Sequence, residues 1–367
     1  GRVSNNFANQ NNRQFRILAA GSADILKDHE ISAGFEYEQR IDRRYAASPV
    51  ALWRQMRLLT NNHILQLDKN NPEPLYFDLT GSPDLSDDTI YGDVINYPRL
   101  YDGASQALFD YNLRKELGLP TDGTDWIDLN SLPPNTFDLS MFSPDELLNN
   151  GSSFIGYYGY DYTGKKLKSK PSLDDFFNQT RTIDGYNGPA VFDRPMGAFE
   201  PNYVAGYIQD KFAFKDLVFN IGLRIDRFDA NQKVLKDPYL LFPAITAGEV
   251  RSGEDRAVLS GDVPDNIGDD YVVYVDNIQD PGLIMGYRDK STWYNSAGAE
   301  IVDAEALQSS SGVLPYLVDP DKTNASEISS NAFVDYKPQT NFMPRIAFSF
   351  PISDEALFFA HYDVLTQ

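Results

Sequence analysis

Clustered carboxylates are the first residues of this chain whose types and spacing could do chemistry. Asp84, Asp87 and Asp88 form one group, and Asp319 and Asp321 belong to another. Hard cations such as Ca²⁺ take oxygen ligands, so each group is a candidate for a loop-bound calcium ion. Neither group has EF-hand spacing, and the alternative is that the aspartates occupy turns of a solvated acidic loop. We expect no other cofactor.

Catalytic motifs are missing from the sequence. The three histidines, His29, His63 and His361, lie far apart and outside any HExxH or triad-like pattern. No GxSxG, P-loop or GxGxxG sequence occurs, and the chain has no cysteine that could act as a thiolate nucleophile. The sequence therefore predicts that this chain is not an enzyme and that its histidines occupy ordinary polar positions.

A dense run of tyrosines is the candidate for ligand recognition. Tyr157, Tyr158, Tyr160 and Tyr162 lie within one short segment. Tyrosine offers a large amphipathic contact area at low entropic cost, which suits the recognition of peptides or sugars. The same composition equally suits a loop that packs on itself or on a partner protein. The sequence leaves both interpretations open.

Three strand hairpins must position these residues, and they are predicted over about 13–40, 202–229 and 343–366. The middle hairpin has a tight turn at Lys215-Asp216. Side chains in a strand alternate between two faces, so Leu223 and Ile225 face one side while Arg224 and Asp226 face the other. Each hairpin thus combines an apolar face with a polar one. This pattern fits a transmembrane barrel around a polar lumen, and it also fits a soluble sandwich whose apolar face is core.

The polar residues that share the inner parity of the three hairpins form a second candidate site. They are Arg16, Glu36, Glu38, Arg224, Asp226 and Arg345. Such residues could contact a plug domain or a passing ligand. The alternative is that any large barrel lines its lumen with polar groups, because these groups face water or the plug.

Two very long connections, about 41–200 and 230–342, distinguish the barrel from the sandwich. Short helices are expected after Ser48, from Ser143, over 172–178 and near 303–308. Connections in compact domains are usually about 4–6 residues long, whereas outer-membrane barrels combine short periplasmic turns with long extracellular loops. We therefore expect an all-β fold, part of a large transmembrane antiparallel barrel whose remaining strands lie outside residues 1–367. Soluble β domains with large insertions remain the alternative.

Composition narrows the class of protein. The chain has 367 residues and a formal net charge of −21 at pH 7, which argues against nucleic-acid binding because no basic field meets the phosphates. Its aromatic content of 13% argues against disorder. No apolar run is long enough for a transmembrane helix, and the polar opening shows no signal-peptide pattern. Both ends read as cut, so we expect a piece of a longer protein.

The hairpin sequences resemble a known family. The middle hairpin is similar to a barrel hairpin of TonB-dependent outer-membrane receptors, particularly the Oar-like group of Bacteroidota with a carboxypeptidase-regulatory-like domain. Its sequence is AGYIQDKFAFKDLVFNIGLRIDRFDAN. The last hairpin, FMPRIAFSFPISDEALFFAHYDVLTQ, resembles the hairpin that follows in these receptors. The first hairpin contains HEISAGFEYEQR, which resembles the preceding one. The segment IGYYGYDYTGKK is similar to a loop of the same proteins. The similarity covers the strand pairs well and the long loops only in patches.

The resemblance implies a barrel of 22 strands in the bacterial outer membrane, with a plug domain and a TonB box that are not in this chain. It implies a transporter that captures a nutrient (a peptide, glycan or chelate) through its extracellular loops and imports it with energy from the TonB system. A lipoprotein lid or other outer-membrane proteins are expected partners, besides the lipid itself. The alternative is a non-transporting barrel subunit whose loops bind other proteins of a larger assembly. No ligand-contact motif of the family maps onto a residue here.

Overall fold

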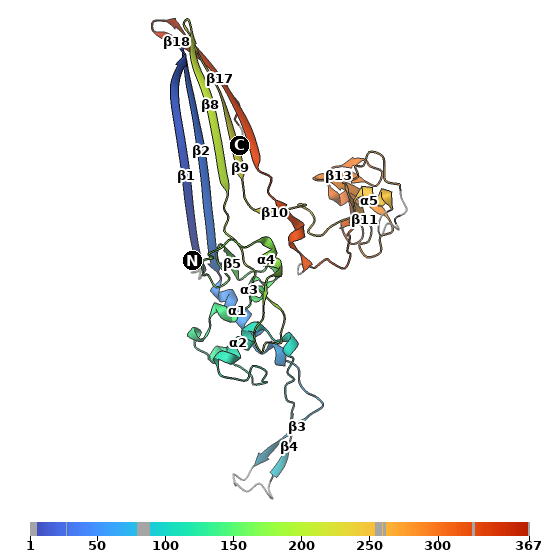
Figure 1. The fold of residues 1–367 in the computed structure, drawn as a ribbon. Coiled ribbons are helices and arrows are strands. Elements are labelled where there is room, and N and C mark those ends of the chain that lie inside the picture. The colour runs from blue at the N-terminus through green and yellow to red at the C-terminus, as the bar shows by residue number, and fades with distance from the viewer. Residues whose placement is uncertain are drawn as a thin grey trace. The chain divides into compact units, whose positions relative to one another are not determined.

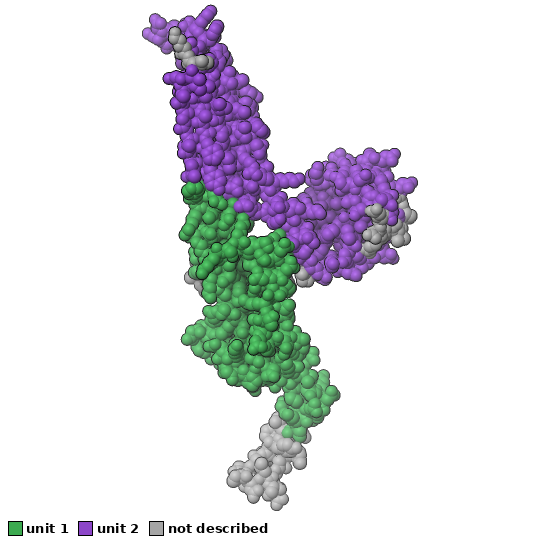
Figure 2. All heavy atoms as spheres, in the orientation of Figure 1, with its two compact units in different colours: residues 1–15, 39–200 green, residues 16–38, 201–367 purple. Residues whose placement is uncertain are grey.

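The computed structural model describes residues 6–26, 28–78, 89–253, 259, 262–324 and 327–365. The chain divides into two compact units (Figure 2): unit 1 comprises residues 1–15 and 39–200, and unit 2 comprises residues 16–38 and 201–367. The fold is mostly β, with 41% of residues in strands and 19% in helices. No helix in the described ranges is long and apolar enough to cross a membrane.

A large curled antiparallel sheet, a half-barrel, dominates the fold (Figure 1). Its strand order is β1-β2-β8-β9-β17-β18. The strands are β1 (Phe7–Leu26), β2 (His29–Ala47), β8 (Asn202–Phe214), β9 (Leu217–Asp229), β17 (Gln339–Ser353) and β18 (Ala356–Asp363). All three predicted hairpins are confirmed, and the first is longer at its open end than predicted. The predicted turn at Lys215-Asp216 is confirmed too, with Lys215 at a φ of 55°.

The strand register confirms the two faces that the alternation predicted. Residues directly opposite each other on antiparallel strands share a face, and Leu223 lies opposite both Ile208 and Pro344. Its neighbour Arg224 lies opposite Tyr207 and Met343 on the other face. One face of the sheet therefore gathers aliphatic and aromatic side chains, and the other gathers the charged ones.

The first long connection folds into a helical module with its own core in unit 1. Its helices are α1 (Pro49–Leu59), α2 (Leu108–Glu116), α3 (Pro144–Leu148) and α4 (Leu173–Asn178), and its strands are β3 (Glu73–Asp78), β4 (Thr89–Asn96), β5 (Ile155–Tyr158), β6 (Thr180–Arg181) and β7 (Val191–Phe192). Short 3-10 turns join them: η1 (Asn62–Ile64), η2 (Gly103–Ser105), η3 (Leu129–Ser131), η4 (Pro134–Thr136), η5 (Leu139–Met141) and η6 (Asn149–Gly151).

The three helices predicted in this connection are confirmed, because their start signals are local. Ser143 and Ser172 each form a reciprocal capping box with the acidic residue three positions on. Pro49 occupies the first turn of α1. Helix α2 was not predicted, although Phe109 and Leu113 on it are fully buried in the module core.

The second long connection contains a small sheet that the sequence pattern did not predict. Strands β11 (Val272–Val275), β12 (Ile284–Asp289), β13 (Thr292–Asn295), β14 (Glu300–Ile301) and β15 (Leu314–Pro315) pair in the order β14-β13-β12-β11-β15. The rest of this connection contains helix α5 (Ala247–Ser252) and the turns η7 (Ala304–Leu307) and η9 (Ser330–Ala332). It also contains a separate two-stranded sheet of β10 (Lys233–Leu235) and β16 (Phe333–Asp335). A core around Val273, Tyr287 and Tyr316 is almost fully buried. The turn predicted near 303–308 is confirmed as η7.

Candidate functional site

Four of the six predicted polar residues form one charge network on the polar face of the sheet. The Arg16 guanidinium lies 2.6 Å from the Glu36 carboxylate, and Arg224 approaches the same carboxylate at 3.6 Å from across the intervening strand β8. Arg224 also pairs with Asp226 at 2.7 Å. Parity along each strand put these residues on one face, and the sheet order brings them within reach of one another.

Tyr203 on β8 completes the network. Its hydroxyl donates a hydrogen bond to Asp226 at 2.6 Å and accepts one from Arg224 at 2.8 Å. Tyr203 is not among the predicted site residues, because the alternation in β8 is weak and the pairing to β9 is what fixes its face. Each ion pair of the network joins a partly exposed arginine to a carboxylate that is only 13% exposed at Glu36 and 18% exposed at Asp226. Glu38 lies two residues beyond Glu36 on the same face.

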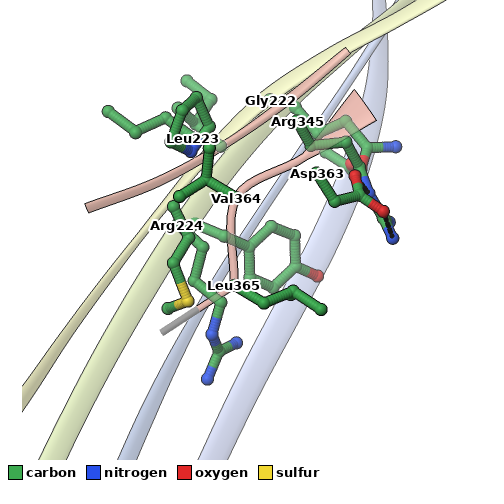
Figure 3. A pocket seen from close by; sticks show the side chains of 13 residues that line it. Gly222, Leu223, Arg224, Arg345, Asp363, Val364 and Leu365 are labelled. Atoms are coloured by element: carbon green, nitrogen blue, oxygen red, sulfur yellow. Dashed lines mark hydrogen bonds and ion pairs between the residues drawn. The ribbon is translucent and has the colours of Figure 1, made fainter. Parts of the chain in front are cut away.

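A cavity of about 440 Å³ opens on this polar face (Figure 3). Arg345 pairs with Asp363 at 2.8 Å on one side of it, and Arg224 lies on the other. Residues 363–365 line it where the chain leaves β18, and the Val364 N–H donates to the Pro344 carbonyl at 3.1 Å. Ligand pockets typically measure about 300–1,000 Å³, so the cavity has room for a small molecule that carries anionic or hydrogen-bonding groups.

A second hollow, of about 370 Å³, shares Arg345 and Asp363 with the first. It adds Lys211, Asn220 and His361. His361 lies opposite Ala347, which in turn lies opposite Asn220 on the polar face. The cavities thus offer cations and hydrogen-bonding groups for binding, and no nucleophile and base are paired there within the described residues.

The opposite face of the sheet is apolar and exposed on all three hairpins. Its exposed large side chains include Ile17, Phe35, Ile208, Ile221, Leu223, Ile225, Phe342, Ile346 and Tyr362. His29 sits near its turn end, paired with Asp210 at 2.8 Å and stacked on Phe212. An exposed apolar surface of this extent marks contact with lipid or with another protein.

Gly34 fixes how the polar face packs between β2 and β8. The Tyr207 ring lies over this glycine, and a Cβ atom at position 34 would lie 2.3 Å from Tyr207 Cε1. We expect Gly34→Val to lower the free energy of unfolding of the sheet by about 1–3 kcal/mol, the usual cost of overpacking. Equilibrium unfolding of the full-length protein in detergent measures this, and Tyr207→Ala added to Gly34→Val should restore most of the loss. Gly21→Val on β1, where no atom lies within 4 Å, is the matched control.

The tyrosine run belongs to the core of unit 1 rather than to a recognition surface. Tyr157, Tyr160 and Tyr162 are 9%, 5% and 8% exposed. The Tyr157 hydroxyl donates to the Arg194 carbonyl at 2.8 Å, and Tyr158 packs on Phe199. The prediction of ligand contact is therefore corrected for the three buried tyrosines, and the alternative of a loop that packs on itself holds for them.

Of the two aspartate groups, only Asp319 and Asp321 lie within the described residues, and they belong to a turn. Asp84, Asp87 and Asp88 lie outside the described residues. Asp319 pairs with Lys322 at 3.1 Å and accepts the Asp321 N–H at 3.2 Å, which is a turn arrangement. In the part of the chain that the structure describes, no group of three or more histidine or acidic side chains could hold a metal ion.

His63 does not occupy the ordinary polar position predicted for it but belongs to a buried polar cluster. Its Nδ1 lies 3.3 Å from Asp110, which pairs with Arg114 at 2.8 Å, and none of the three side chains is exposed. Gln106 and Asn61 bond to the same aspartate. Desolvation, opposed by Asp110, lowers the pKa of His63, so its protonation in acid opposes folding. Nothing in the linear spacing of 61, 63, 106, 110 and 114 signals the cluster.

Glu146 makes the stability of unit 1 depend on pH. Its carboxylate accepts the backbone N–H groups of Ser143 and Phe109, and burial raises its pKa to about 7, although these hydrogen bonds act to lower it. The folded state therefore holds a proton that the unfolded state releases above its ordinary pKa of 4.5. This contribution is fully present below pH 4.5 and is lost as the pH rises through about 7.

We expect the unfolding free energy of wild type relative to Glu146→Gln to fall between pH 4.5 and pH 8 by up to about 3 kcal/mol. Urea unfolding of the full-length protein at several pH values, followed by hydrogen exchange at the Phe109 amide, measures the difference. His63 makes the unfolding free energy depend on pH in the opposite direction. Because wild type and Glu146→Gln both contain His63, its contribution cancels in the difference between them. A difference that stays constant with pH would contradict the prediction.

Aromatic side chains do line a surface hollow elsewhere, in the second connection. A cavity of about 620 Å³ is bordered by Tyr239, Tyr274 and Trp293. The almost fully buried Arg288 stacks under these three rings and pairs with Asp237. These aromatics come from separate segments of the chain, so no local run marks them in the sequence.

No family model, no curated protein and no solved structure matches this chain. Its function therefore has to be inferred from the geometry of the sheet and from the hairpin sequences.

Proposed function

We propose that the curled sheet is part of the wall of a bacterial outer-membrane barrel, and that the protein is a TonB-dependent transporter. The observation that carries the proposal is the two-sided sheet, exposed and apolar on one face and charged on the other, across all three hairpins. A sheet of this kind suits lipid outside and a polar lumen inside. The resemblance of the hairpins to those of TonB-dependent receptors supports the same proposal.

In this proposal the charge network and its two cavities face the lumen. Arg224, Arg345 and Lys211 would meet a plug domain or a passing nutrient, such as a peptide, a glycan or a chelate. Charges that pair among themselves, as Arg224 does with Asp226, can exchange partners with a ligand at little net cost. The role we assign to the site is therefore binding and passage, with no catalytic step. The TonB system would supply the energy through segments outside residues 1–367.

A second candidate function is a non-transporting barrel subunit of a larger outer-membrane assembly. The observation that favours it is that both long connections fold into modules with buried cores, and that the tyrosine run serves one of these cores. Preformed surfaces change little on association and suit stable protein contacts. In this case the modules would bind partner proteins, and the polar face would hold a fixed plug.

Purification of the full-length native protein in mild detergent, with mass spectrometry of everything that accompanies it, tests the proposal. A bound small molecule, or a single lipoprotein lid, supports transport. The double variant Arg224→Ala/Arg345→Ala should then lose the small molecule. The control double variant Lys69→Ala/Lys115→Ala, which changes two exposed lysines outside the site, should retain it. A stable set of large partners without a small molecule favours the subunit function. Recovery of the protein in the aqueous fraction without detergent would overturn the outer-membrane location.

A further inference from the structure

Three cations gather in unit 1, outside the site described above. Arg13 comes from β1, Arg43 from β2, and Lys166 from the segment after β5. Backbone pairing holds the segments together, since Arg44 lies opposite Tyr158 and Lys166 forms a bridge with Tyr160. Strand β1, which carries Arg13, is the sheet neighbour of β2, which carries Arg43, and the charges of both arginines act on Lys166. The fold therefore brings together like charges from three separate segments.

None of these three cations makes an ion pair within the described residues. The chain carries 53 acidic against 32 basic residues, and most arginines described above are matched to a carboxylate. Arg43 Nη1 is instead buried with no hydrogen-bond partner. A buried guanidinium nitrogen without an acceptor costs free energy. A bound anion would supply the missing acceptor and would offset the repulsion among the three cations.

The Arg43 side chain is held in place by its aliphatic stem. The stem crosses Gly159, where an added Cβ would lie 2.4 Å from Arg43 Cγ, and Gly159 has a φ of 71° that favours glycine. Little side-chain entropy is then left to lose when Arg43 binds a ligand. Desolvation, and after it the charges of Arg13 and Arg43, lower the pKa of Lys166. An anion bound among the three would offset that repulsion.

We propose that Arg13, Arg43 and Lys166 bind a phosphate group. Guanidinium groups match phosphate oxygens through paired N–H donors, and a lysine adds a mobile point charge. The phosphate could belong to the headgroup of an outer-leaflet lipid or to free phosphate, and both present the same oxygens. Arg43 lies six residues beyond Tyr37 on β2, past the apolar run of that strand. The lipid source rests on the proposed function, whereas the phosphate site does not.

The test uses the full-length protein in mild detergent and two probes. One probe is bisphosphorylated lipid A, with its dephosphorylated form as the reference, followed by native mass spectrometry. The other is inorganic phosphate, followed by calorimetry at low salt. The variant Arg43→Gln with Lys166→Gln removes two charges and keeps long side chains. Lys69→Gln with Lys115→Gln removes the same charge from two other exposed positions of unit 1 and is the control.

We expect the phosphorylated lipid to bind at least tenfold more tightly than the dephosphorylated one, and the Arg43/Lys166 variant to lose that preference. Binding of inorganic phosphate alone, with the same loss, supports the site with free phosphate as the source. Equal binding by the Arg43/Lys166 variant and wild type, an equal loss in the control variant, or no binding of either probe overturns the proposal. Lys166→Gln alone changes one exposed side chain and gives the same readout if the double variant fails to fold. A wild-type protein that binds phosphate but does not enter membranes would refute the proposed function and leave the site standing.

Discussion

On the proposed function, Leu223→Arg is expected to destabilise the membrane-inserted protein by about 2–4 kcal/mol, the cost of an arginine on the lipid face of a barrel near the bilayer midplane. Leu223 lies on the apolar face, opposite Ile208 on one side and Pro344 on the other, and it is 38% exposed. Reversible urea unfolding of the full-length protein in phospholipid vesicles measures the change. The fraction that stays folded on an unheated gel gives a second readout.

Asn220→Arg, three residues away on the same strand, is the matched control. Asn220 lies on the polar face, opposite Lys211 and Ala347. In the proposed barrel an arginine there would meet a polar lumen, and we expect a loss below about 1 kcal/mol from the repulsion by Lys211. If both variants are tolerated equally, the apolar face does not contact lipid, and the sheet would be part of a protein whose apolar face is covered by other protein.

Asp110→Ala is expected to destabilise the unit 1 module by about 3–5 kcal/mol, because it leaves the fully buried Arg114 guanidinium without its carboxylate. Asp110 also accepts hydrogen bonds from the Asn61 N–H at 2.7 Å and from Gln106 at 3.0 Å. Removing it therefore deprives donors on Asn61, Gln106 and Arg114 of this acceptor. Hydrogen exchange of the α2 amides in the full-length protein measures the local loss.

Two further variants separate the charge from the packing at this cluster. Asp110→Ala with Arg114→Met removes both charges, and we expect it to recover much of the stability, since a buried ion pair often contributes little over apolar groups of similar volume. Glu116→Ala changes an exposed acid of the same helix and should stay within about 0.5 kcal/mol of wild type. If Asp110→Ala behaved like Glu116→Ala, the cluster would not support the module.

These two predictions address different parts of the proposed function. The Leu223 variant asks whether the sheet meets lipid, which both the transporter and the subunit interpretation require. The Asp110 variant asks whether the first module is a firmly folded body. A module that unfolds while ligand capture persists would favour transport, because the polar face would then suffice. Loss of partner proteins together with the module would favour the subunit function.

The sequence by itself determined the three hairpins and the helices α1, α3 and α4, because their signals are local. Period-2 alternation around Leu223 and Arg224 sorts residues onto two faces without knowledge of their neighbours. The capping boxes at Ser143 and Ser172 span four residues each. The polar set around Arg224 could therefore be named in advance, though not its pairing through Glu36, which depends on the strand order.

Only the tertiary structure decided what covers each side chain. A run of tyrosines such as Tyr157 and Tyr160 looks the same in the sequence whether it faces solvent or a core. Only packing against segments far along the chain decides whether these side chains are exposed or buried. The strands β11 to β15 are two to six residues long, too short for alternation to show, and they are held by pairing across the connection. The His63–Asp110–Arg114 cluster and the Arg13–Arg43–Lys166 cations arise in the same way. Their chemistry comes from proximity between distant segments, which residue spacing along one chain does not encode.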